Sequence, residues 1–178
     1  QTAVLGAPEV REVSVLFADI VGFTTMSEKM SPAAVALLLN EYLSRMTDIV
    51  FKYEGTLDKY IGDAIMAVFG APLDMPDHAE RAIRCALEMH ERLEEFNQER
   101  REGPKIHIRI GVNTGRAVAG EIGSINKTEY TVLGDTVNIA SRLESSVAQP
   151  GTTAVGATTY EAVKHFVRGR CLGERALK

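Results

Sequence analysis

The sequence predicts an α+β fold in which helices pack against a β-sheet. Two long stretches, residues 32–53 and 78–96, carry apolar residues at three- and four-residue steps, which is the period of a helix with one buried face. Short runs rich in β-branched and aromatic residues lie around them, as is typical of strands. With 178 residues and 45% hydrophobic content, the chain is long enough for one well-buried core and too short to expect two.

The first predicted strand covers residues 13–19. Residues 1–12 show no period and include a glycine and a proline, so we expect them to form a linker or a frayed arm. Within the strand, alternate residues share an apolar face, and that alternation carries Asp19 to the strand end. A short loop, residues 20–24, then leads into a helix.

A β-hairpin is predicted for residues 56–69. Its two strands are separated by Gly62-Asp63, a two-residue connection in which glycine supplies the positive φ of a type II′ turn. The turn places Asp63 at the hairpin tip. Pairing about the turn places Lys59 opposite Met66 on an apolar face, where a lysine needs a partner.

The second half of the chain continues the alternation of strands and helices. The second helix ends at Gly103-Pro104, and the elements predicted after it are a strand at 106–112, a turn at Thr114-Gly115, strands at 116–123 and 129–133, a helix at 135–146, a short strand, a short helix near 158–165 and a last strand cut off at Lys178. Strand, helix, hairpin, helix and strand is the order of a ferredoxin-like β-α-β-β-α-β unit, which a smaller C-terminal α/β subdomain extends.

Two groups of polar residues stand out on this scaffold. Asp19 and Asp63 end strands beside a strand-to-helix loop with free backbone N–H groups, and such a set can hold hard divalent cations together with polyphosphate. Asn138 and Arg142 lie at positions i and i+4, on one side of a helix. On spacing alone, two ordinary loop aspartates and a solvated helix face remain open as interpretations.

Three stretches of the chain resemble, in the same order, the catalytic domain of class III nucleotidyl cyclases. They are Phe17-Ala18-Asp19-Ile20-Val21-Gly22-Phe23-Thr24, Lys59-Tyr60-Ile61-Gly62-Asp63 and Gly134-Asp135-Thr136-Val137-Asn138-Ile139-Ala140-Ser141-Arg142. Three motifs in register are a far more specific signal than a lone glycine motif. The resemblance implies that residues 13–178 form such a catalytic domain, truncated at its C-terminal end.

The resemblance assigns roles to particular residues. By similarity, Asp19 and Asp63 bind two Mg²⁺ or Mn²⁺ ions joined by the backbone carbonyl of Ile20, and two metals can stabilise both oxygens of an in-line phosphoryl displacement. Asn138 corresponds to the family residue that positions the ribose, and Arg142 to the one that meets charge on the α-phosphate in the transition state. The residues expected to contact the phosphates are Val21, Gly22, Phe23 and Thr24, through their amides, together with Arg116 and Lys178.

Base recognition is expected to rest on Lys59 and Thr131. Lysine donates to the acceptor N1 of adenine, whereas guanylate cyclases of this family carry Glu at that position. The commoner adenylate cyclases have Asp where this chain has Thr131, whose hydroxyl is a weaker and less directional acceptor for the adenine amino group. Threonine here also resembles a subgroup reported to respond to bicarbonate, which activity measurements at fixed pH with rising bicarbonate would test.

The resemblance implies an adenylate cyclase that converts metal-bound ATP to 3′,5′-cyclic AMP and pyrophosphate. Because the family builds each site between two domains and this chain holds both sets of residues, a head-to-tail homodimer is expected. A guanylate cyclase is the nearest alternative, and an inactive nucleotide-binding or dimerisation module is another. A diguanylate cyclase is disfavoured because its Gly-Gly-Asp/Glu-Glu-Phe signature does not occur at the hairpin.

Composition narrows the partners further. A net charge of −4 argues against nucleic acid or an anionic membrane surface as the main partner. No apolar run approaches the roughly 20 residues of a membrane span, and two cysteines without CxxC spacing favour a reducing, cytoplasmic compartment. We expect an excised segment whose parent protein carries regulatory domains.

Overall fold

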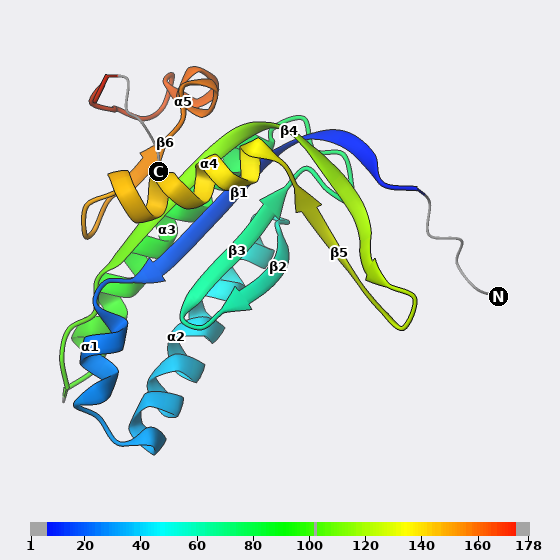
Figure 1. The fold of residues 1–178 in the computed structure, drawn as a ribbon. Coiled ribbons are helices and arrows are strands. Elements are labelled where there is room, and N and C mark those ends of the chain that lie inside the picture. Colours follow the sequence, from blue (N-terminus) through cyan, green and yellow to red (C-terminus); the bar gives the residue numbers. More distant parts are fainter. Residues whose placement is uncertain (1–6, 102, 174–178) are drawn as a thin grey trace.

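One β-sheet organises the chain (Figure 1). The computed structural model describes residues 7–101 and 103–173, and within them the strands follow the order β2-β3-β1-β4-β5, with β6 pairing parallel to β4. The antiparallel order β2-β3-β1-β4 is that of the predicted β-α-β-β-α-β unit. The strands are β1 (Glu9–Ile20), β2 (Thr56–Ile61), β3 (Ala64–Phe69), β4 (Ile108–Ser124), β5 (Lys127–Leu133) and β6 (Thr153–Val155).

Helices cover both faces of this sheet. α2 begins as the sequence predicts, because Ser31 Oγ accepts a hydrogen bond from the Ala34 amide at 3.1 Å and Pro32 takes the first helical position. α2 and α3 pack on one face and α4 crosses the other (Figure 1). The helices are α1 (Phe23–Glu28), α2 (Pro32–Lys52), α3 (His78–Glu99), α4 (Asp135–Arg142), the π-helical turn η1 (Leu143–Val147) and α5 (Ala157–Val163).

The central strand β1 is buried on both faces. Leu16 and Ile20 belong to the core cluster shared with α2 and α3, whereas Val15 and Phe17 belong to the cluster that includes Ala140 of α4. This alternation follows from the two-residue period of a strand. The two layers fix the end of β1, where Asp19 lies, from both sides.

The sheet curls enough for side chains of its two edge strands to touch. β4 pairs with β1 over its first part and with β5 over its last part, and Figure 1 shows β4 bending along its length so that β5 faces the β2–β3 hairpin. β2 and β5 are at opposite ends of the strand order, yet the Thr131 hydroxyl of β5 donates a hydrogen bond to Asp58 Oδ2 of β2 at 2.7 Å. The curl therefore brings side chains 73 positions apart into contact.

Two boundaries predicted from the sequence are wrong, and one pairing explains both. β1 begins at Glu9, so residues 9–12 are a strand and not the linker expected over 1–12. β4 runs unbroken through Thr114-Gly115, where a turn was expected. Residues 9–12 pair antiparallel with residues 116–119 of β4, and this ladder keeps both segments extended.

The hairpin departs from regular pairing at one residue. Lys59 lies opposite Met66, as predicted, but Leu57 pairs with Ala67 instead of Val68. Asp58 is therefore the extra residue of a β-bulge, which turns its side chain away from the position that strict alternation would give it. The Asp58 side chain is only 2% exposed.

The C-terminal part extends the same sheet through β5, α4, β6 and α5. α4 ends at Arg142, four residues before the predicted end of its helix, and the chain continues as η1. Residues 167–173 form no strand. The last predicted strand and Lys178 at its end lie outside the described residues.

The backbone of α4 and η1 packs directly against Gly111 of β4, where there is no space for a side chain. A Cβ at this position would lie 2.5 Å from the Ala140 carbonyl oxygen and closer still to the Glu144 amide nitrogen. Because both neighbours are backbone, Gly111→Ala should lower the free energy of unfolding by about 1–3 kcal/mol. Denaturation of this variant and of Ser146→Ala, an exposed change in η1, would check it, and equal stability of the two variants would contradict it.

Candidate active site

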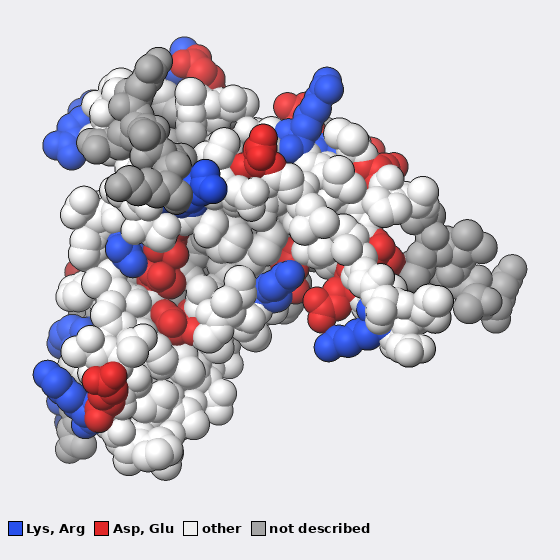
Figure 2. Space-filling model, in the orientation of Figure 1, with Lys and Arg blue, Asp and Glu red and all other residues white. Residues whose placement is uncertain are grey.

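A hydrogen bond joins the hairpin tip to the end of β1. The backbone N–H of Ile20 donates to Asp63 Oδ2 at 2.9 Å. Gly62 has a φ of 63°, which allows the tight connection that presents Asp63 at the tip. Asp19 precedes Ile20, so the structure brings together the two aspartates that the sequence singles out. The space-filling view shows acidic atoms on this face where β1 ends, between α4 and α1 (Figure 2).

Arg109 and Glu144 lie beneath this junction. Arg109 Nε is 3.7 Å from Asp19 Oδ1 and 3.5 Å from Glu144 Oε2, which is ion-pair distance without hydrogen-bond geometry. All three of these atoms are buried and have no hydrogen-bond partner within the described residues, and the same holds for the Tyr42 hydroxyl. Buried polar atoms without hydrogen-bond partners are rare in proteins, so these four atoms indicate a functional site.

Burial sets the protonation of this cluster. Burial raises the pKa of Asp19, and nearby Asp63 raises it further while Glu144 and Arg109 oppose the shift. Burial, followed by the neighbouring Asp19 carboxyl, raises the pKa of Glu144 to about 8. Burial also raises the pKa of Tyr42, and the negative charges of Asp63, Asp19 and Glu144 raise it further. Ionising both Asp19 and Glu144 in this buried cluster is therefore unfavourable unless positive charge is added.

Asp19 and Asp63 fit a site for divalent cations. Mg²⁺ and Mn²⁺ prefer oxygen ligands, and Asp19 Oδ1 is a buried oxygen without a hydrogen-bond partner among the described residues. Over residues 7–101 and 103–173, no three Asp, Glu, His or Cys side chains form a ready-made metal cage. Two carboxylates suffice where water and substrate phosphates supply the remaining ligands, as is usual for Mg²⁺.

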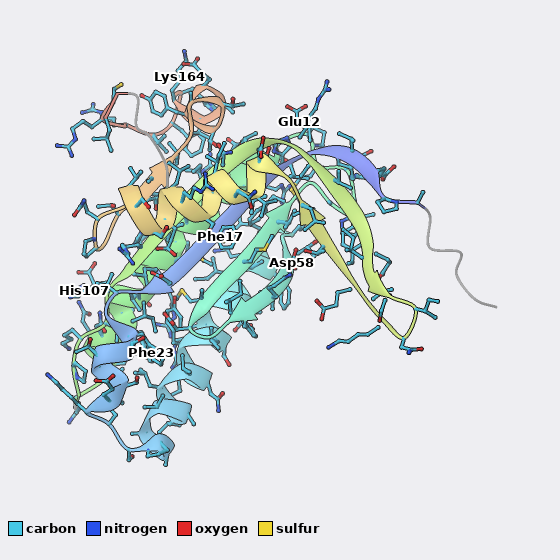
Figure 3. The ribbon with its side chains drawn as sticks, in the orientation of Figure 1. Glu12, Phe17, Phe23, Asp58, His107 and Lys164 are labelled. Atoms are coloured by element: carbon cyan, nitrogen blue, oxygen red, sulfur yellow. The ribbon has the colours of Figure 1, made fainter. Side chains whose placement is uncertain are left out.

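The loop after β1 is shorter than expected. Val21 and Gly22 connect β1 to α1, so Phe23 and Thr24 already belong to the helix. The Val21 amide donates to the His107 carbonyl at 2.8 Å and is already paired in this structure, so its expected contact with phosphate stays a prediction. Figure 3 labels Phe23 and His107 on either side of this connection. The amides of Gly22, Phe23 and Thr24 have no hydrogen-bond acceptor among the described residues.

Asn138 and Arg142 project from the exposed side of α4. Thr136 and Ala140 bury the opposite side, and the Thr136 hydroxyl donates to the Arg116 carbonyl at 2.7 Å. Arg116 is itself exposed. Within the described residues, the side chains of Asn138, Arg142 and Arg116 make no hydrogen bond or ion pair with the rest of the chain. They are free to contact other molecules.

The curled edges of the sheet bring Lys59 and Thr131 to the same carboxylate. Thr131 is 7% exposed and donates to Asp58 Oδ2, while Lys59 Nζ lies 3.7 Å from Asp58 Oδ1. Figure 3 labels Asp58 between the hairpin and β5. The partner that the sequence required for Lys59 is therefore its own neighbour Asp58.

Sequence reasoning missed Asp58, Tyr42, Arg109 and Glu144. Only Asp58 left a signal, in the unmet need of Lys59 for a partner, but strict alternation would have pointed its side chain to the opposite face. Arg109 lies on a predicted strand and Glu144 on a predicted helix, and neither position indicates burial.

The described residues contain no helix that is both long enough and apolar enough to cross a membrane.

The raised pKa of Glu144 predicts how stability depends on pH in the absence of metal. The ordinary value is 4.5 and the folded value is about 8, so the folded state holds a proton that the unfolded chain lacks between these values. Stability should therefore fall as pH rises through this range. We expect the melting temperature in EDTA to fall less for Glu144→Gln than for the wild type between about pH 5 and pH 8.

The matched control is Glu129→Gln, since the Glu129 side chain is 58% exposed. Its melting temperature should follow the wild-type curve. Parallel curves for the wild type and Glu144→Gln would show that Glu144 does not titrate in this range.

Known proteins resemble this chain in sequence and in fold. A sequence model of the family described as adenylate and guanylate cyclase catalytic domain matches residues 5–178. Adenylate cyclase 1 of Rhizobium meliloti (strain 1021) is 40% identical over 171 residues, which are 94% of this chain and 26% of that protein. This chain thus spans about a quarter of the length of that relative.

Solved structures of both nucleotide specificities share the fold. The adenylyl cyclase CyaB from P. aeruginosa superimposes with a TM-score of 0.89 at 33% identity, covering 97% of this chain and 90% of that one. The guanylyl cyclase Cya2 gives a TM-score of 0.87 at 36% identity, covering 97% and 87%. The family match over residues 5–178 and these similarities show that the chain belongs to the family of adenylate and guanylate cyclase catalytic domains.

Proposed function

We propose that this chain is the catalytic domain of an adenylate cyclase that converts metal-bound ATP to 3′,5′-cyclic AMP and pyrophosphate. The observation that carries the proposal is the junction of Asp19 and Asp63, held by the Ile20 amide at one end of the sheet. Lys59 and Thr131 add a second, base-sized set of polar groups between the curled sheet edges. In a site formed by two chains, one set would meet the phosphates and the other the base of a nucleoside triphosphate.

Catalytic domains of this family use divalent metal ions. In the proposal, Asp19, Asp63 and the Ile20 carbonyl would hold two Mg²⁺ or Mn²⁺ ions, and such ions would supply positive charge for an in-line displacement at phosphorus. Arg109 lies within ion-pair distance of both Asp19 and Glu144 and offsets part of their negative charge. The amides of Gly22, Phe23 and Thr24, with Arg116, bind the β- and γ-phosphates, and Lys178 is proposed to reach them as well.

The proposed chemistry is attack of the ribose 3′-hydroxyl on the α-phosphate. Asn138 orients the ribose, and Arg142 meets the negative charge that grows on the α-phosphate oxygens with two guanidinium donors. Both side chains project freely from α4, which packs against β4 through its buried face. Positioning and charge stabilisation of this kind account for most catalysis of phosphoryl transfer.

Base choice in the proposal follows from Lys59 and Thr131. Lys59 donates to adenine N1 and Thr131 accepts from the adenine amino group; guanine presents a donor and an acceptor at these points in reverse. A guanylate cyclase is the second candidate, because guanylyl cyclases share the fold at similar identity. Lys59 favours adenine. A response to bicarbonate belongs to the same proposal through the threonine at position 131.

The proposed active unit is a head-to-tail homodimer in which each site takes Asp19 and Asp63 from one chain and Lys59, Asn138 and Arg142 from the other. In support, the side chains of Asn138 and Arg142 make no hydrogen bond or ion pair within the described residues. The face that carries α4 and the hairpin shows wide areas without charge (Figure 2). Exposed apolar side chains on β2 and β5, including Tyr60, Ile61 and Leu133, suit burial against a second copy.

The first test is nucleotide turnover by the purified chain. With Mg²⁺ or Mn²⁺ present, ATP should yield cyclic AMP and pyrophosphate with a higher kcat/KM than GTP yields cyclic GMP. Arg142→Ala should lower kcat by roughly a hundredfold to a thousandfold, because it removes donors to the transition state. Product identification by mass spectrometry would check both, and nucleotide binding without any cyclic product would instead favour an inactive module.

Complementation tests the shared sites. Asp63→Ala and Arg142→Ala chains should each retain about 1% of wild-type activity or less alone, but a mixed dimer retains one site that uses the intact aspartates of one chain and the intact arginine of the other. Random 1:1 exchange should restore about a quarter of wild-type activity, since half of the dimers are mixed and each has one working site of two.

Melting curves would establish that both variants fold, and chain exchange would be followed with differently labelled chains. No recovery despite exchange would rule out sites shared between chains.

A further inference from the structure

Asp58 is a buried carboxylate with an unusual environment. The β-bulge in β2 places it between the hairpin and β5, where its side chain is 2% exposed (Figure 3). Oδ2 accepts the hydrogen bond from Thr131 at 2.7 Å. Oδ1 is buried, lies 3.7 Å from Lys59 Nζ and has no hydrogen-bond partner among the described residues. Burying an acidic side chain costs free energy, so the buried position of Asp58 between Thr131 and Lys59 calls for a functional reason.

The bond to Asp58 decides what the Thr131 hydroxyl can offer a ligand. A threonine hydroxyl has one hydrogen to donate and two lone pairs that accept, and it rotates to suit its neighbours. An ionised carboxylate can only accept. Because the hydrogen of Thr131 points to Asp58, only its lone pairs remain, and the hydroxyl acts toward the base solely as an acceptor.

Lys59 completes the pattern. Its ammonium has three donors and no acceptor, and its side chain is 39% exposed. The 3.7 Å separation from Asp58 Oδ1 is an ion pair without a direct hydrogen bond, so the donors of Lys59 are not consumed by it. Asp58 therefore attracts the ammonium to the position beside Thr131 while leaving it free to donate.

We propose that Asp58 is a specificity-determining positioning residue: it fixes Thr131 as an acceptor beside the donor Lys59, which complements the N1 acceptor and amino donor of adenine. Guanine would meet an acceptor opposite its O6 and a donor opposite its N1–H. The inference rests on the proposed function and deepens it. A threonine hydroxyl without this partner could rotate and donate to guanine O6. The selectivity for adenine therefore comes from the Asp58 carboxylate, which accepts the Thr131 hydroxyl hydrogen.

Asp58→Asn tests this with the least change in shape. The asparagine amide can donate to the Thr131 oxygen, which frees the hydroxyl hydrogen to reach guanine O6. The ratio of kcat/KM for ATP to that for GTP should fall about 10- to 100-fold, since a hydrogen bond to a charged group is involved. Asp48→Asn, an exposed aspartate on α2, is the matched control and should keep the wild-type ratio.

A double-mutant cycle separates polarity from packing. Thr131→Val removes the hydroxyl, so adding Asp58→Asn to it should change the ATP/GTP ratio much less than Asp58→Asn does in the wild type. Equal losses of ATP and GTP turnover in Asp58→Asn, with the ratio unchanged, would overturn the proposal and leave a structural role. An undiminished effect of Asp58→Asn in the Thr131→Val background would overturn it as well.

Binding measurements keep this inference distinct from the proposed activity. Dissociation constants for fluorescent ATP and GTP analogues should show the same fall in the ratio for Asp58→Asn. A wild-type chain that binds ATP over GTP but forms no cyclic nucleotide would refute the proposed enzyme, whereas a binding ratio that Asp58→Asn leaves unchanged would refute the role of Asp58.

Discussion

The hydrogen bond from the Ile20 amide to the Asp63 carboxylate is the contact on which the site depends. It ties the tip of a hairpin to the end of the central strand, two points 43 positions apart in the chain. β1 is itself held by β3, by β4 and by apolar layers on both faces, so Asp19 is presented by a well-supported strand to which Asp63 is tied. Rigid presentation matters because metal-assisted phosphoryl transfer relies on positioning more than on covalent chemistry.

Around that junction the fold concentrates buried polar groups whose hydrogen bonding is incomplete. Asp19, Glu144, Arg109 and Tyr42 all bury polar atoms without hydrogen-bond partners inside the described chain. Such an arrangement costs stability, and natural proteins tolerate it mainly at functional sites. The raised pKa values of Asp19 and Glu144 express the same cost, because burial disfavours the charged form of both carboxyl groups. Added cations would relieve it.

Between the edge strands β2 and β5, two backbone features determine where Asp58 lies: the curl of β4 and the bulge of β2. Without the curl, β2 and β5 would remain at opposite edges, and without the bulge, Asp58 would point away from Lys59. Together they place one carboxylate beside both Lys59 and Thr131. Base selection in this proposal is therefore a property of two backbone irregularities as much as of the side chains.

Local patterns in the sequence predicted most of this architecture. Periodicity located the long helices, Gly62-Asp63 located the hairpin, and three short motifs indicated the family, because each of these signals depends on neighbours in the chain. Long-range pairing decided the rest. The extension of β1 to Glu9 and the continuity of β4 exist only because the two strands pair, and the burial of Asp58, Arg109 and Glu144 depends on elements that are distant in sequence. The sequence by itself determined which residues the chain could use for nucleotide chemistry; the tertiary structure decided which neighbours set their charge and hydrogen bonding, since those forces act through space.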